Sequence, residues 1–240
     1  MKSNSNERCR AFNRETFCDW FQTSSGLSLR EVEVAFLVRA MRVGYNQRVL
    51  QLGALGWEDR LGDADLLSGY CVVDPVALAH PAVVQIRARL DQLPIATESI
   101  DVLIMVHTLE FESNQHQVVR EAERVLKPEG QLLLLGFHPW SLHRIVALLS
   151  GKRKQLPWCG HFISRHRVHD WLGLLNFAVD DDVRLVVDGS TFSAHLFPLG
   201  YAINAVKRRY TLIPLAPVRA SRARLIPLGV VDRSMTKSTL

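Results

Sequence analysis

The apolar segment 100–106, Ile-Asp-Val-Leu-Ile-Met-Val, constrains the fold more than any other part of the chain. A polar turn precedes this run, and the chain becomes polar again at His107 and Thr108, so the segment is typical of one buried strand. A second apolar run, 131–137, follows the turn Lys-Pro-Glu-Gly at 127–130. Strands that are apolar along most of their length are covered on both faces, which indicates a mainly parallel sheet.

Shorter apolar runs alternate with stretches of helical periodicity along the rest of the chain. Strands are expected at 48–52, 69–73, 82–87, 100–106, 131–137, 183–187 and 200–207. Helices are expected at 29–41, 115–126, 138–150 and 164–175, the first opened by a capping box of Ser28 and Glu31. This alternation predicts an α/β fold with a doubly wound sheet and helices on both faces, in which the last two strands form an antiparallel pair.

Charge is distributed unevenly along the 240 residues. The formal net charge is +5, but residues 207–240 hold eight Lys or Arg against one Asp, whereas residues 1–206 carry a net charge of −2. We therefore separate a helical segment (1–45), an α/β domain (46–209) and a basic, flexible tail (210–240). A basic tail is either a solvated extension or a surface that binds nucleic acid or anionic membrane through counterion release.

The spacing of the cysteines and the hydropathy of the chain are informative about the cellular compartment of the protein. The four cysteines, at 9, 18, 71 and 159, are widely spaced, which argues against a disulfide framework and suits a reducing cytoplasm. No apolar run reaches the roughly 18 residues of a membrane span, and the first residues lack the apolar core of a signal peptide.

Several strand ends carry residues suited to ligand binding, because open α/β sheets bind ligands at the carboxyl ends of their strands. Gly53 follows the first strand, where a glycine either allows close approach of a ligand or simply makes a tight turn. Asp74 and Pro75 follow the second strand, and a carboxylate there can accept hydrogen bonds from both ribose hydroxyls of a nucleoside cofactor. Alternatively, Asp74 is a solvated turn residue. His107 is a candidate base on an acceptor or a polar cap on its strand.

Segments 93–111 and 124–137 resemble the middle of class I S-adenosylmethionine (SAM)-dependent methyltransferases of the type 11 sort, and segment 171–179 resembles the step before the sixth strand of that family. The resemblance extends over about 48–207. It implies SAM as the cofactor and a seven-stranded, mostly parallel, Rossmann-like sheet whose last strand is reversed. It implies that SAM contacts Gln51, Gly53, Ala54, Asp74, Pro75, Arg89, Leu90, Asp91 and His107, with His107 also as the candidate catalytic residue.

The chain departs from the family pattern around the expected cofactor pocket. Gln51 stands where the family has an acidic residue, and Leu55 and Trp57 stand where it has glycines, although Gly56 lies out of frame nearby. Arg89 replaces an aspartate, and an arginine cannot accept a hydrogen bond from an adenine amino group.

Three functions are consistent with these residues. The first is SAM-dependent methylation of an unidentified, small-molecule acceptor. The second is a non-catalytic partner or regulatory module, and the third is a nucleic-acid methyltransferase or binder that uses the tail. Arg165 and Arg167 interrupt the histidines at 161, 166 and 169, so we expect no metal site there. The basic triplet 152–154 is either a solvated loop or a contact for an anionic substrate or nucleic acid.

Overall fold

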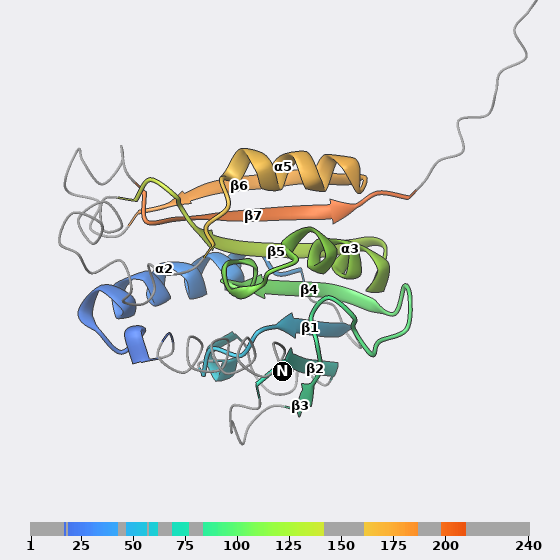
Figure 1. The fold of residues 1–240 in the computed structure, drawn as a ribbon, viewed down its shortest axis with the longest axis horizontal. Coiled ribbons are helices and arrows are strands. Elements are labelled where there is room, and N and C mark those ends of the chain that lie inside the picture. The colour runs from blue at the N-terminus through green and yellow to red at the C-terminus, as the bar shows by residue number, and fades with distance from the viewer. Residues whose placement is uncertain are drawn as a thin grey trace, which may run out of the picture. The chain divides into compact units, whose positions relative to one another are not determined.

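The computed structural model describes residues 17, 19–42, 47–56, 58–61, 69–76, 84–141, 161–186 and 198–209. Its centre is one seven-stranded sheet with the strand order β3-β2-β1-β4-β5-β7-β6 (Figure 1). The strands are β1 (Arg48–Leu52), β2 (Gly69–Asp74), β3 (Val84–Arg87), β4 (Ile100–Val106), β5 (Leu126–Phe137), β6 (Phe177–Leu185) and β7 (Gly200–Lys207). The helices are α2 (Ser24–Ala40), α3 (Gln115–Val125) and α5 (Arg165–Leu174), with short 3₁₀ turns η1 (Glu58–Leu61) and η2 (Leu109–Phe111).

The pairing of the strands confirms the predicted fold class. Strands β3, β2, β1, β4 and β5 are parallel to one another, and β7 runs antiparallel to both β5 and β6. The sequence therefore correctly predicts a Rossmann-like, mostly parallel sheet with a reversed final strand. The chain separates into the compact units Met1–Tyr210 and Thr211–Leu240, and the predicted tail lies outside the described residues.

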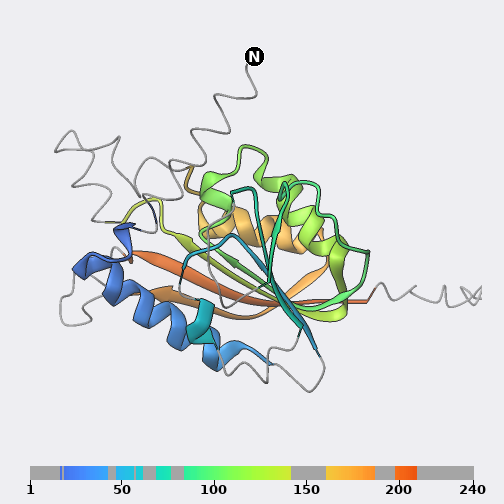
Figure 2. The same cartoon turned by 90° about the horizontal axis from the view of Figure 1, so that it is seen from below.

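Helices cover both faces of the sheet because alternate strand residues point to opposite sides (Figure 2). Leu103 and Met105 of β4 belong to the core that faces α3 and α5. Val102 and Ile104, one position away in each case, belong to the core that faces α2. The side chains of all four are 0–2% exposed, which explains why the strand appears as a continuous apolar run.

Three elements begin five or six residues before their expected positions. Helix α2 begins at Ser24, because the Thr23 side chain accepts a hydrogen bond from Gly26 N at 3.2 Å, whereas the predicted cap Ser28 lies inside the helix and donates to Ser24 O. Strand β5 begins at Leu126 rather than 131. Strand β6 begins at Phe177 and contains three consecutive aspartates, which an edge strand tolerates.

Other expectations lie at the limits of the described residues. The predicted helix 138–150 falls mostly outside them, as do the first two residues of the strand expected at 82–87. Among the described helices, none is both long and apolar enough to cross a membrane.

Candidate functional site

The carboxyl ends of β1, β2 and β4 meet at the centre of the sheet, where the strand order reverses direction. From β1 the chain continues outward to β2 and β3, and it then returns to β4 on the other side of β1 (Figure 1). A doubly wound sheet opens its ligand crevice at such a switch point. The loops after β1, β2 and β4 therefore form the candidate site.

The loop after β1 is held by hydrogen bonds from each of its described backbone amides, those of residues 53–56. Gly53 N donates to Val73 O at 2.9 Å, and Ala54 N donates to an Asp74 carboxylate oxygen at 2.8 Å. The next two amides, of Leu55 and Gly56, both donate to the carboxylate of Glu58 at 2.5–3.2 Å. The loop is thus closed around the protein's own carboxylates.

The conformation of this loop depends on two glycines. Gly53 and Gly56 have φ angles of 90° and 81°, in the left-handed region that favours glycine. The out-of-frame Gly56 therefore supplies a turn that the sequence pattern alone did not assign to it. Trp57, at the position of the expected third glycine, lies outside the described residues.

Glu58 provides the carboxylate that the first strand lacks. Gln51 lies at the end of β1 where the family has an acid, and its amide donates to Glu58 Oε1 at 3.0 Å and to Gly53 O at 2.7 Å. The Gln51 carbonyl oxygen accepts a hydrogen bond from the Tyr70 hydroxyl. Glu58 is only 2% exposed. The carboxylate is thus present near the strand end, but it comes from η1 instead of β1.

Asp74 links the loops after β1 and β2. One carboxylate oxygen accepts from Ala54 N, and the other accepts from Val76 N at 2.7 Å. The residue is 3% exposed, so it is not a solvated turn aspartate. Each carboxylate oxygen has two lone pairs, which leaves the group chemically able to accept further hydrogen bonds.

The loop after β3 presents its residues in different ways. Arg89 points outward with a side chain that is 67% exposed, and its guanidinium pairs with the Asp91 carboxylate at 2.7 Å. Leu90, in contrast, is buried in the core that faces α3. The intermediate burial of Pro75 places it near the surface after β2. The predicted contact residues of this region therefore divide into an apolar group and an exposed ion pair.

His107 lies at the end of β4 and is completely buried between two carboxylates. Its Nε2 is 2.7 Å from Glu33 Oε1 of α2, and its Nδ1 is 3.5 Å from Glu110 Oε1 of η2. Burial alone lowers the pKa of His107, but Glu33 and Glu110 outweigh this effect and raise the pKa to about 9. The imidazole therefore carries a proton at neutral pH.

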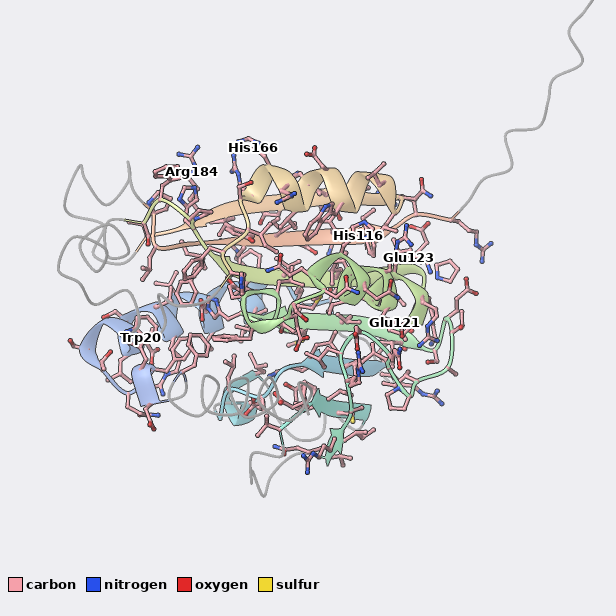
Figure 3. All side chains as sticks on the ribbon, viewed as in Figure 1. Trp20, His116, Glu121, Glu123, His166 and Arg184 are labelled. Carbon is pink, nitrogen blue, oxygen red and sulfur yellow. The ribbon has the colours of Figure 1, made fainter. Side chains whose placement is uncertain are left out.

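Aromatic rings surround this buried ion pair. Phe137 stacks on the His107 ring at a centroid distance of 4.0 Å, and Phe17 meets it edge-on at 5.4 Å. Phe17 and Phe21 are fully buried, and both pack against Trp20, which is labelled in Figure 3. A protonated imidazole stacked on an aromatic face gains cation–π stabilisation.

The structure brings four of the nine predicted site residues together in one hydrogen-bonded group. Gln51, Gly53, Ala54 and Asp74 form one hydrogen-bonded group, whereas His107 belongs to a separate buried cluster. Sequence reasoning missed Glu58, Glu33 and Glu110. Of these three, only Glu58 could have been found from the local sequence, because it is an acidic residue seven positions after Gln51 and lies next to the incomplete glycine loop. Within the described residues, no group of three His, Cys, Asp or Glu is placed to hold a metal ion.

Comparisons with known proteins agree with this geometry. Residues 72–134 match the family described as a methyltransferase domain. Over 146 residues the chain is 35% identical to the uncharacterized protein YafS of Escherichia coli K12, which covers 58% of this chain and 61% of YafS. The match thus spans less than two thirds of that relative.

Solved structures show the same fold at low sequence identity. A complex of the Haloferax volcanii Trm112 methyltransferase activator with a methyltransferase matches with a TM-score of 0.62 and 14% identity, over 82% of this chain and 98% of that one. A SAM-dependent methyltransferase of Thermotoga maritima matches with a TM-score of 0.59 and 19% identity, over 82% of this chain and 100% of that one. By its strand order and these structural matches, the chain has the fold of the class I methyltransferases, and residues 72–134 match the methyltransferase domain family.

Proposed function

We propose that the protein is a SAM-dependent methyltransferase that acts on a small-molecule acceptor in the cytoplasm. The observation that carries this proposal is the position of Asp74. Its carboxylate is buried at the carboxyl end of β2, at the switch point, and is hydrogen-bonded to the loop after β1. A carboxylate at this position suits the ribose hydroxyls of a nucleoside cofactor.

The charge of the candidate pocket suits SAM, which carries a sulfonium and an ammonium group against one carboxylate. Glu58 and Asp74 place two buried carboxylates around the loop after β1. In this proposal Asp74 holds the ribose, Pro75 and Leu90 contact the adenine, and Gln51, Gly53 and Ala54 line the opposite wall. Arg89 and Asp91 form the rim, since their ion pair is largely exposed on the arginine side.

Bound SAM supplies an electrophilic methyl group, so the protein's task is to align the acceptor and exclude water. His107 was predicted as a catalytic residue, but its ring has no exposed surface in this structure. We therefore propose that His107 is a positioning residue, which joins α2 to the end of β4 through Glu33. A direct role for His107 on an acceptor would require the aromatic cluster to open.

Isothermal titration calorimetry with SAM and with S-adenosylhomocysteine tests this proposal. We expect micromolar binding that is weakened about a hundredfold by Asp74→Ala, because two hydrogen bonds to a charged group are lost. Asp74→Asn should give an intermediate affinity, since the asparagine carbonyl can still accept one of them. Asp170→Ala, on an exposed position of α5, is the matched control and should leave the affinity unchanged.

The closed loop after β1 favours a second candidate, a non-catalytic partner or regulatory module. The four described amides of this loop, at residues 53–56, already have acceptors within the protein. If the protein shows a normal cooperative unfolding transition but does not bind SAM at up to millimolar concentration, the result would favour this non-catalytic function over methyl transfer.

Nucleic-acid binding through the basic tail is the third candidate, and it rests on the sequence alone. Removal of the residues after Arg209 tests it directly. Unchanged retention of the shortened protein on a nucleic-acid column at low salt would count against this function.

A further inference from the structure

Four cationic or titratable side chains gather at the carboxyl edge of the sheet beyond β5. Phe137 at the end of β5 and Leu185 at the end of β6 both pair with Gly200 of β7, so the residues next to them, His138 and Arg184, lie at one edge. The start of α5 is fixed at the same edge, because His161 N donates to Glu110 O at 2.8 Å.

The group contains more positive than negative charge. Arg165 pairs with Asp182 at 3.2 Å, and His169 shares the same carboxylate at 2.7 Å. Arg184 has no ion-pair partner among the described residues, and it is exposed. Figure 3 shows Arg184 and His166 near each other beside the end of β6. Asp182 thus leaves part of the positive charge uncompensated.

This positive charge acts on the pKa of His138. Partial burial lowers the pKa of His138, and the charges of Arg184, Arg165 and His166 lower it further. Two segments that are distant from His138 in the sequence, one with Arg165 and His166 and one with Arg184, therefore act on its imidazole. The first turn of α5, which Ser164 caps by accepting a hydrogen bond from Arg167 N at 3.4 Å, adds the positive end of the helix dipole at the same place.

The sequence of the connection from β5 to α5 has the same bias. Residues 138–169 contain six Lys or Arg and five His, and no Asp or Glu, whereas residues 1–206 as a whole carry a net charge of −2. The basic triplet 152–154 belongs to this stretch. A uniformly basic segment within an acidic body is typical of a surface that attracts anions.

We propose that the group of His138, Arg165, His166 and Arg184 binds an anionic group, a phosphate or a carboxylate, of the methyl acceptor, with the guanidinium groups of Arg165 and Arg184 as the cations. The identification of this anion as part of the acceptor rests on the proposed function, whereas anion binding itself does not. An Arg guanidinium gives two parallel hydrogen bonds to either group, and a helix N-terminus adds backbone donors. The cation-rich edge beyond β5 is separate from the carboxylate-rich loops after β1 and β2, so cofactor and acceptor would meet opposite charges.

The test is a titration of the full-length protein with inorganic phosphate and with acetate, against chloride at constant ionic strength. Binding is followed through the imidazole resonances of His138 and His166, which single His→Gln variants assign. We expect saturable shifts of both resonances with one of the two anions, and the better anion indicates the class of acceptor. Arg184→Gln should weaken binding about tenfold, as loss of a charge-assisted hydrogen bond predicts. Arg184→Lys should restore part of it.

Arg120→Gln, at an exposed position on α3, is the matched control and should leave the shifts unchanged. Shifts that are the same in chloride, or that are unaffected by both Arg184→Gln and Arg165→Gln, would overturn the proposal. Binding of a single-stranded oligonucleotide that depends on Arg184, without phosphate or acetate binding, would replace the small-molecule anion with a nucleic acid. Calorimetry with SAM is a separate measurement, so a failure of the proposed function is distinguishable from a failure of anion binding.

Discussion

The two sides of the carboxyl edge use charge in opposite ways. On the side of β1 and β2, the buried carboxylates of Glu58 and Asp74 hold backbone amides. On the side of β5 and β6, the partly exposed cation Arg165 pairs with the carboxylate of Asp182, and the exposed cation Arg184 has no ion-pair partner among the described residues. A buried charge must be satisfied within the protein, whereas an exposed charge remains available to a ligand. The comparison indicates that the first side determines local structure and the second side determines recognition.

The largest expected effect tests the carboxylate side. Glu58→Ala removes the acceptor of Leu55 N, Gly56 N and the Gln51 amide. We expect the free energy of unfolding to fall by about 3 kcal/mol, because buried donors lose their partner. Urea unfolding followed by circular dichroism measures the change. Glu31→Ala, at an exposed position of α2, is the control. If Glu58→Ala and Glu31→Ala lowered the free energy of unfolding equally, the distinction between the buried carboxylates and the exposed charges would be removed.

A pH-dependent effect tests the cluster that lies between the two sides. The pKa of His107 is raised to about 9 in the folded protein, above the ordinary 6.5. The stabilisation is therefore complete below about pH 6.5 and is lost as the pH rises through 9. We expect the free energy of unfolding to fall by roughly 2–3 kcal/mol between pH 6 and pH 9.5. Glu33→Gln should reduce this fall.

The exposed His166 provides the control for this measurement. His166→Gln removes an imidazole but no buried ion pair, so the variant should keep the full pH dependence. If Glu33→Gln and the unmodified protein lost the same stability over this range, Glu33 would not be the partner that keeps His107 protonated.

A pair of glycine substitutions gives smaller effects of opposite sign. A Cβ at Gly136 of β5 would lie 2.7 Å from the Tyr201 hydroxyl and 3.1 Å from Glu110 Oε1, whereas a Cβ at Gly173 of α5 meets nothing within 4 Å. Gly136→Ala should lower the free energy of unfolding by about 1–3 kcal/mol. Gly173→Ala should raise it by up to about 1 kcal/mol, because alanine is the better helix former. Thermal unfolding of both variants measures the difference, and a stabilising Gly136→Ala would show that Tyr201 moves aside freely.

Local sequence patterns predicted the elements whose two faces are buried. The runs at 100–106 and 200–207 match β4 and β7 at both ends, and the helix expected at 115–126 ends one residue earlier in α3. Strands that are buried on both faces are apolar along most of their length, so the sequence alone shows where they lie. Strand β6 lies at the edge, where Asp180, Asp181 and Asp182 need not be apolar, and its first six residues were therefore not predicted.

The same reasoning separates the site residues. The sequence by itself determined the alternation of strands and helices, the position of Asp74 after the second strand and the basic stretch 138–169, because each is a local pattern. Only the tertiary structure decided which partners these groups have. Glu33 and His107 are 74 residues apart in the sequence, and Arg184 reaches His138 through the pairing of β7 with two other strands. The residues next to a charged side chain in the sequence do not indicate which partner it will have. The fold of the whole sheet brings these residues together, and only then can their chemistry be inferred.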